Sequence, residues 1–346
     1  MSSEHELTLR QREILRLIVK EYVQGSRAVG SHTLIERYPL RISSATVRNE
    51  MVSLERMGYI HQLHTSAGRV PTDRGYRFYV ENYAVESALP PNDQIMIRHQ
   101  FRQVETQLES WLQLAASVLS GFAQNVSLVT SPKPSMSRLR HFELLSLNDR
   151  SVLLILVTQE STVRQGVLHL NDEVGQQNLS ACADRLNLLL MNLTAEEARS
   201  RSGGLSGLDR VVCEHVVSTL ASTQASATEL HYHGVEHALQ QPEFSGSDAA
   251  QGLFDLLRGG ALLSELLPQV TYGDDIQVFI GEENRSEELW PFGVVVATYG
   301  VDQEVTGLLG ILGPRRMPYE RSISSVRYMA QLMSDLMRDL YTAQDA

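Results

Sequence analysis

Apolar residues recur at helical spacing three times near the start of the chain. Residues 8–24 carry one apolar stripe, and we expect that helix to end at Gly25. A shorter helix is expected over residues 32–37, with Ser31 as its cap. The third is expected over residues 44–57. Three consecutive short helices of this kind form the core that a helix-turn-helix domain needs.

The third helix has two contrasting faces. Val47, Met51 and Leu54 are spaced i, i+4, i+7, so they share a stripe that packs inward. The other face and its margins carry small or hydrogen-bonding side chains, with no acid at the centre: Ala45, Thr46, Arg48, Asn49, Val52, Ser53 and Arg56. Such a face fits the major groove of DNA, where arginine pairs with guanine and asparagine with adenine. Ser43 and Ser44 can cap the helix and offer donors to phosphate.

A hairpin and a fourth helix follow without a gap. We expect strands at residues 59–63 and 70–71, joined by the turn HTSAGR, in which Gly68 can take a positive φ. Thr72 then caps a helix, and Asp73 in its first turn complements the helix dipole. This order of elements predicts a winged helix-turn-helix domain. The candidate DNA contacts of the turn, where a wing meets phosphate or the minor groove, are His64, Thr65 and Arg69.

Beyond a linker at residues 87–92, helical and strand patterns are mixed. A long helix is expected over residues 92–125, and a last helix over residues 319–341. Strand-like runs occur at residues 126–130, 139–147, 151–158, 163–170, 276–280, 292–299 and 305–312. The continuous apolar run 152–157 is typical of a strand buried on both faces. Strands on both sides of a mostly helical block at 171–272 predict one α+β domain interrupted by an insertion.

Composition and charge refine this picture. At 346 residues, with 42% hydrophobic and 21% charged residues, the chain has the make-up of a globular protein of two or three domains. Residues 1–84 hold 12 lysines and arginines against 9 acidic residues, a net charge of +3, which leaves −14 on the remaining residues. A basic head on an acidic body binds DNA through the head alone. Two cysteines, a polar N-terminus and the lack of a long apolar run indicate a cytoplasmic protein that does not contact the membrane.

The sequence offers few other candidate sites. His231, His233 and His237 have a spacing that metal ligands can use, but no cysteine lies near them, and we expect no metal or other cofactor. Both cysteines are expected to be small core residues. We find no phosphate loop and no G-x-S-x-G nucleophile turn, so we do not expect an enzyme. The segment GILGPRR, residues 310–316, is either an anion or partner contact or a solvated turn.

Several runs of this sequence resemble one bacterial family. They are VGSHTL at 29–34, SSATVRNEM at 43–51, LERMGYI at 54–60, HTSAGRVPTDRGYRFYV at 64–80 and LGPRRMPYERSI at 312–323. These runs are similar to those of HrcA, the heat-inducible transcription repressor of bacteria, although Ala28 stands where the family usually has proline. The resemblance implies an α+β multidomain fold. It comprises a winged helix-turn-helix domain at 1–84, a GAF-like domain at 92–170 and 273–346, and an inserted, mostly helical dimerisation domain at 171–272.

The resemblance also implies partners. It implies a homodimer on double-stranded DNA, at the CIRCE inverted repeat of chaperonin operons, and an active fold that depends on the GroE chaperonin. The residues that we expect to contact DNA are Ser43, Ser44, Thr46, Arg48, Asn49, Ser53, Arg56, His64, Thr65 and Arg69. Two alternatives stay open. A small-molecule sensor needs a deep polar pocket in a sheet of residues 126–170 and 273–312, and an enzyme needs titratable groups that converge in a cleft.

Overall fold

The computed structural model describes residues 7–63, 68–84, 88–104, 107–134, 137–148, 150–159, 163–170, 172–225, 229–258, 261–271, 275–301 and 305–344. The chain forms two compact units. The first comprises Met1–Ser131, Leu230–Gly300 and Gly307–Ala346, and the second comprises Pro132–Glu229 and Val301–Thr306.

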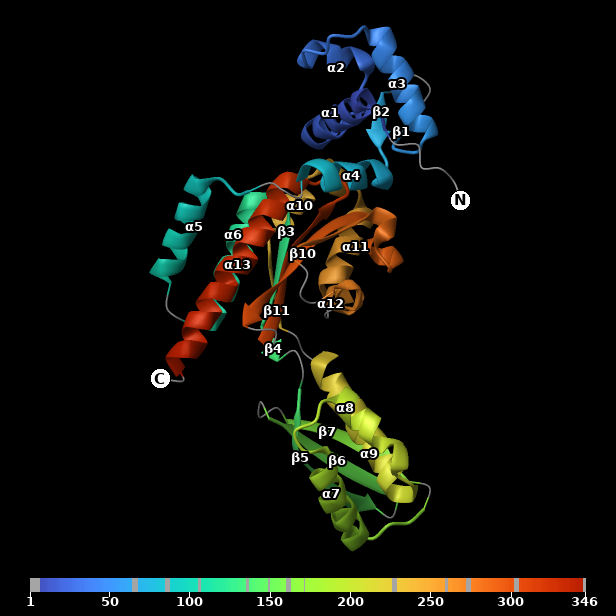
Figure 1. Cartoon of the computed structure of the whole chain (residues 1–346), viewed down its shortest axis with the longest axis vertical. Coiled ribbons are helices and arrows are strands. Elements are labelled where there is room, and N and C mark those ends of the chain that lie inside the picture. Colours follow the sequence, from blue (N-terminus) through green and yellow to red (C-terminus); the bar gives the residue numbers. More distant parts are fainter. Residues whose placement is uncertain are drawn as a thin grey trace. The chain divides into compact units, whose positions relative to one another are not determined.

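The first unit begins with the expected three helices, hairpin and fourth helix (Figure 1). Their bounds are α1 Leu9–Gly25, α2 Ser31–Arg37, α3 Ser44–Arg56, β1 Ile60–Gln62, β2 Arg69–Pro71 and α4 Asp73–Tyr79, which continues as a π-helical turn at Val80–Ala84. β1 and β2 pair antiparallel, with His61 opposite Val70. The apolar stripes meet in a core that holds Ile14, Leu15, Ile18, Leu34, Val47, Met51 and Leu54. This is the winged helix-turn-helix that the sequence predicted.

Two helix ends differ from the prediction. Gly25 is still helical, and Ser26 takes the left-handed conformation with φ 52°. α2 begins at Ser31 itself, with Gly30 as its N-cap. The Ser31 hydroxyl lies 3.0 Å from the hydroxyl of Ser44, the first residue of α3. A direct side-chain contact therefore links the starts of α2 and α3.

The remainder of the first unit, here called the sheet domain, is built on an antiparallel sheet of order β8-β3-β11-β10-β9. The strand bounds are β3 Val126–Thr130, β8 Leu230–His233, β9 Gln277–Ile280, β10 Phe292–Val301 and β11 Val305–Pro314. On one face, the Ser127 hydroxyl of β3 donates to the Ala116 carbonyl of α6 at 2.6 Å. Val126 and Leu128 point to the opposite face, into a core closed by α10, α11 and α12.

The helices of the sheet domain surround this sheet (Figure 1). Their bounds are α5 Pro91–Gln103, α6 Leu108–Ala123, α10 Val235–Leu239, α11 Ser247–Leu257, α12 Ala261–Leu266 and α13 Tyr319–Gln344. Short 3-10 helices lie at Pro242–Phe244, Leu267–Gln269, Gly281–Glu283 and Glu287–Leu289. The single helix predicted over 92–125 is thus two helices, because Val104 is extended after α5. The apolar rhythm continues across this break, so periodicity alone did not locate it.

The second unit is a three-stranded meander covered by helices. Its bounds are β4 Lys133–Pro134, β5 Leu139–Asn148, β6 Ser151–Thr158, β7 Val163–His169, α7 Gln176–Leu190, α8 Ala195–Arg201, a 3-10 turn at Ser202–Gly204, and α9 Gly207–Ala225. β6 pairs antiparallel with β5 and β7, and α7 and α9 pack on one face. Burial alternates along β6, so the prediction that 152–157 is buried on both faces is wrong.

The strands do not form the one interrupted sheet that the sequence suggested. β5, β6 and β7 make a sheet of their own, separate from β3 and β9–β11. The helical block 171–272 is divided as well: described residues 172–225 pack with β5–β7, whereas β8 and α10–α12 belong to the sheet domain. Strand β8 itself was not expected. Its four residues, LHYH, are too short and polar for a recognisable strand pattern.

Candidate nucleic-acid interface

Both ends of α3 are fixed by local hydrogen bonds. The Ser43 hydroxyl accepts the Thr46 N–H at 3.1 Å, which caps the helix as predicted. At the other end Gly58 takes φ +77°, and the Tyr59 N–H reaches the Leu54 carbonyl at 3.0 Å. These contacts hold the helix in place without using the side chains at its centre.

The outward face of α3 is open. Ala45, Arg48, Asn49 and Arg56 are exposed, while Val52 is half-buried. The inward stripe of Val47, Met51 and Leu54 is fully buried in the winged-helix core. The face predicted for the major groove is therefore accessible within its own compact unit.

The acids of α3 are paired inside the domain. Glu50 accepts hydrogen bonds from Gln11 at 3.1 Å and from Arg10 at 3.4 Å, both on α1. Glu55 pairs with Arg69 of the wing at 3.0 Å. Arg48 and Arg56 have no acidic partner in the parts of the chain that the structure describes. The outward face consequently presents uncompensated positive charge, which favours phosphate and guanine.

The predicted hydroxyl contacts already have partners within the protein. Ser43 and Thr46 hydroxyls lie 2.9 Å apart, and Ser44 contacts Ser31. Ser53, half-buried, accepts the side-chain amide of Gln11 at 3.2 Å. A hydroxyl can accept and donate at once, so these groups are oriented by the domain and keep the capacity for a further bond.

Arg69 is the predicted residue that the structure places differently. Its side chain is 13% exposed and bonded to Glu55, and its backbone pairs with Val29 through N–H to carbonyl bonds of 2.9 Å in both directions. The guanidinium therefore braces the base of the wing and is not a free phosphate donor. Gly68 is needed for close approach to the backbone of residues 28–29, where a Cβ would lie 2.6 Å away, and it does not have the positive φ that we expected. His64 and Thr65 lie outside the described residues.

Two residues that support α3 were not recognised as such from the sequence. The Thr72 hydroxyl donates to the Gly58 carbonyl at 2.6 Å, and Arg74 Nη1 donates to the Met57 carbonyl at 3.0 Å. The Arg74 guanidinium also lies 4.5 Å from the centre of the Tyr59 ring. Both residues come from the start of α4, and the only signal for them was the helix cap at Thr72.

The three candidate histidines do not converge on one metal site, although His231 lies with Glu109 and Glu229 in a group whose possible ligand atoms are within 4.8 Å of one another. His231 lies 3.7 Å from Glu109, whereas His233 and His237 lie near Glu236 at 3.9 and 4.0 Å. Among the described residues these three histidines do not bring their ring nitrogens together. Both cysteines are buried in the core of the second unit, as expected. Burial, and a hydrogen bond to Asp209, raise the pKa of the Cys182 thiol to about 12, which makes it unreactive.

Both parts of the chain match models of a known family. The model described as "Winged helix-turn-helix transcription repressor, HrcA DNA-binding" matches residues 6–82, and "HrcA protein C terminal domain" matches residues 109–323. A heat-inducible transcription repressor HrcA of Thermomicrobium roseum is 45% identical over 341 residues, which cover 98% of this chain and 98% of that protein. The chain belongs to the HrcA family of heat-inducible transcription repressors.

Further HrcA relatives agree with this assignment. The protein of the same description from Herpetosiphon aurantiacus is 43% identical, with 97% of each chain covered. A crystal structure of a hypothetical protein at 2.2 Å resolution has the same fold, with a TM-score of 0.56 and 23% identity over 96% of this chain and 98% of that one. Family membership makes the winged helix a DNA-binding domain and the chain a transcription repressor. None of the described helices is long and apolar enough to cross a membrane.

Proposed function

We propose that this chain represses heat-shock chaperonin operons by binding the CIRCE inverted repeat as a homodimer in the cytoplasm. The observation that carries the proposal is the exposed, acid-free face of α3, held on a winged helix of the HrcA family. In this proposal Arg48, Asn49 and Arg56 read base edges in the major groove. Ser43, Ser44, Thr46 and Ser53 line the margins of that face and contact phosphate or bases.

The second unit supplies the proposed dimer contact. Cross-strand neighbours Leu145, Leu153 and Val167 form an apolar row on the face of the β5–β7 sheet that α7 and α9 leave open. Leu145 is 44%, Val167 49% and Val163 55% exposed. An apolar face of this kind is costly to leave in water, and a second copy of the same face would cover it. The expected insertion 171–272 contributes its helices 172–225 to this unit.

Two finer features of the proposal rest on family membership. The sheet domain corresponds to the GAF-like part, and GroE assistance to the repressor links its activity to the supply of free chaperonin. The sensor alternative is weakened because the core between the sheet and α10–α12 is filled by apolar side chains such as Leu128, Phe292 and Leu312. The enzyme alternative requires titratable groups that converge in a cleft. Those that line the cleft beside α4 are engaged in ion pairs, Asp73 with Arg315 and Glu243 with Arg316, which favours a structural role for them.

Substitution of Asn49 tests the groove assignment. Asn49→Ala should weaken binding to the inverted repeat by about 1–3 kcal/mol and reduce discrimination against random duplex, because its amide can pair with adenine. Titration of labelled duplexes by fluorescence anisotropy measures both quantities. The matched control is Asn178→Ala, an exposed asparagine on α7 of the second unit. If Asn49→Ala binds both duplexes as tightly as the parent, α3 does not read the groove.

A further inference from the structure

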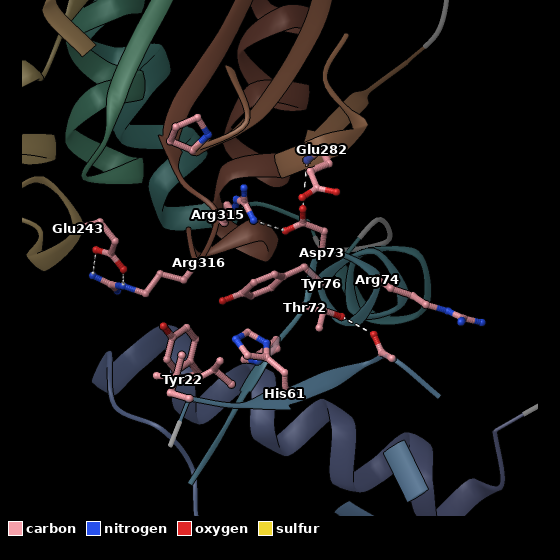
Figure 2. A pocket seen from close by; sticks show the side chains of 15 residues that line it. Tyr22, His61, Thr72, Asp73, Arg74, Tyr76, Glu243, Glu282, Arg315 and Arg316 are labelled. Carbon is pink, nitrogen blue, oxygen red and sulfur yellow. Dashed lines mark hydrogen bonds and ion pairs between the residues drawn. The ribbon is translucent and has the colours of Figure 1, made fainter. Parts of the chain in front are cut away.

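The arginine pair Arg315 and Arg316, whose role the sequence left open, lies where the sheet domain meets the winged helix (Figure 2). Arg315 follows β11, and its Nη1 lies 3.3 Å from the Asp73 carboxylate at the start of α4. Arg316 pairs with Glu243 and donates from Nη1 to the Val23 carbonyl of α1 at 3.1 Å. Both arginines therefore contact winged-helix elements from the sheet domain.

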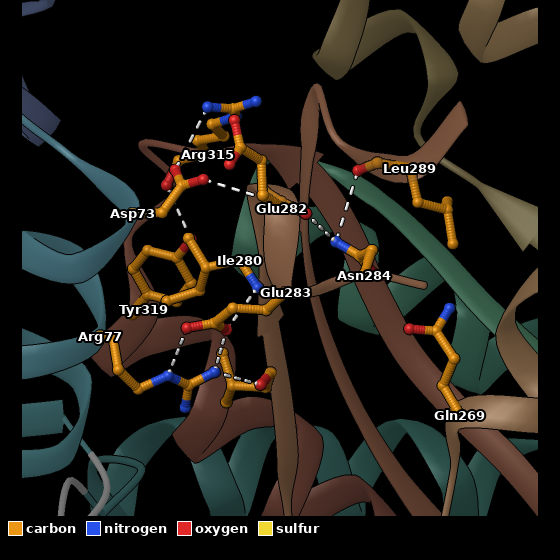
Figure 3. Close-up of polar contacts among 12 residues, drawn as sticks. Asp73, Arg77, Gln269, Ile280, Glu282, Glu283, Asn284, Leu289, Arg315 and Tyr319 are labelled. Carbon is orange, nitrogen blue, oxygen red and sulfur yellow. Dashed lines mark hydrogen bonds and ion pairs between the residues drawn. The ribbon is translucent and has the colours of Figure 1, made fainter. Parts of the chain in front are cut away.

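Asp73 occupies a site shaped for its carboxylate (Figure 3). Besides the contact with Arg315, its Oδ2 accepts the backbone N–H of Glu282 at 3.1 Å. That N–H belongs to the 3-10 turn Gly281–Glu283, whose first residue has φ +54°. A Cβ at Gly281 would overlap the Asp73 carboxylate, so glycine is required for this approach. Asp73 is thus both a first-turn helix acid and an anchor to the sheet domain.

Arg77 makes a second anchor on the same face of α4, one helical turn further on (Figure 3). Its Nε donates to Glu283 Oε1 at 2.8 Å, and its Nη2 donates to Glu283 Oε2 and, at 2.6 Å, to the Val278 carbonyl of β9. The pair is bidentate, which fixes direction as well as distance. The acid and base of α4 therefore face a base and an acid of the sheet domain, and a shifted docking would place like charges together.

The same helix also holds the end of the recognition helix α3. Thr72 and Arg74 donate to the carbonyls of Gly58 and Met57, as described above. Carbonyls at the end of a helix lack partners within that helix, so these bonds fix the position of the end of α3 relative to α4. α4 and its cap consequently connect α3, through Thr72 and Arg74, to the sheet domain, through Asp73 and Arg77.

An open cleft of about 560 Å³ lies beside this joint (Figure 2). Its walls include His61 of the wing and Glu243 of the sheet domain, so the wing is not packed against the sheet domain there. The side chains of the two anchoring ion pairs are 20% to 39% exposed. Water and salt screen such pairs, and each is weak enough to break and re-form. Beside these pairs, buried Tyr76 packs against Tyr319 of α13 with ring centroids 6.0 Å apart, and the Tyr79 hydroxyl donates to Glu320 at 2.7 Å. The buried contacts fix the joint, and the ion pairs set its direction.

We propose that α4 and its anchors set the angle of the recognition helix, so that Asp73, Arg77, Glu283 and Arg315 are positioning residues for the spacing of operator half-sites. This rests on the proposed binding of a homodimer to an inverted repeat. Two recognition helices on one face of B-DNA lie about 34–36 Å apart, or a multiple of that distance. Because the end of α3 is bonded to Thr72 and Arg74, a rotation of α4 on the sheet domain changes the distance and angle between the two recognition helices of a dimer. A fixed joint accepts one spacing, and a loosened joint accepts several.

The test varies the operator and the joint together. The double variant Asp73→Asn with Glu283→Gln removes one charge from each anchor and keeps the side-chain shapes. The control, Glu197→Gln, breaks an ion pair to Arg138 in the second unit. Full-length proteins are titrated against inverted repeats whose spacer changes by single base pairs, and against a duplex with one arm. Parent and control should prefer one spacing by at least about tenfold, and the double variant should bind several spacings within about threefold.

Binding to the single-arm duplex distinguishes a variant that has lost its spacing preference from a variant that is misfolded. We expect the double variant to bind the single arm within about twofold of the parent, because α3 itself is unchanged. Gly281→Ala, which displaces Asp73 by its methyl group, should flatten the spacing profile in the same way. An unchanged profile in both variants overturns the inference, as does an equal loss on all duplexes including the single arm. If the parent binds inverted repeats no more tightly than the single-arm duplex, the proposed function is wrong, and the inference about the joint, which rests on it, is wrong as well.

Discussion

At the scale of single residues, pairing inside the winged helix decides which cations face outward. Glu50 and Glu55 are engaged by α1 and the wing, and Arg69 is used in that pairing. Arg48 and Arg56 remain on the open face. The helical pattern was sufficient to predict that face. It could not predict the partner of Arg69, because Glu55 lies 14 residues away and the contact exists only in the folded domain.

Alanine at Arg56 and at Arg69 should therefore have opposite consequences. Arg56→Ala should lower the dependence of log affinity on log salt by about 1, because one phosphate or groove cation is lost, and leave stability unchanged. Arg69→Ala should leave that slope unchanged and lower the free energy of unfolding by about 1–2 kcal/mol, because Glu55 loses its partner at a partly buried site. Titrations at several salt concentrations and urea unfolding measure the two effects. If Arg69→Ala reduced the slope of log affinity against log salt, Arg69 would be a DNA contact after all.

At the scale of elements, the sequence predicted the features that depend on neighbouring residues: helix caps, turns and the positions of single strands. The Ser43 and Thr72 caps, the Gly58 turn and the strands 126–130, 151–158 and 292–299 are all present, with bounds within a few residues. The partition of strands between two sheets was not predicted. Strand pairing depends on residues far apart in the chain. Strands of similar apolar composition therefore cannot be assigned to one sheet or the other from their sequences alone.

The open face of the β5–β7 sheet is the proposed dimer contact, and a charge placed on it should weaken the dimer. Val167→Asp should raise the dissociation constant of the dimer at least about tenfold, because it places a charge in the apolar row and solvates it only in the monomer. Sedimentation equilibrium measures the change. Val211→Asp, the same substitution at an exposed valine of α9 on the helical side of the unit, should leave the dimer intact. Equal effects of the two variants would move the dimer contact away from this sheet.

At the scale of the whole molecule, the charge is divided in a way that suits one binding surface. Residues 1–84 carry +3 and the remaining residues −14, so the field of the body repels DNA from everything but the head. The sequence was sufficient to predict this division and the family. The anchors between α4 and the sheet domain could not be predicted, because Asp73 and Arg315 are 242 residues apart in the chain. The charge division implies that DNA contacts are confined to the head.

The central claim is that two copies of α3 bind one inverted repeat, and the most direct measurement is the stoichiometry and affinity of the parent protein on that repeat. Sedimentation velocity with a labelled CIRCE duplex should give two chains on each duplex. Scrambling one arm of the repeat should reduce the affinity at least about tenfold, because one head then loses its base contacts. A single chain on the intact duplex, or equal affinity for the intact and the half-scrambled duplex, would contradict the account.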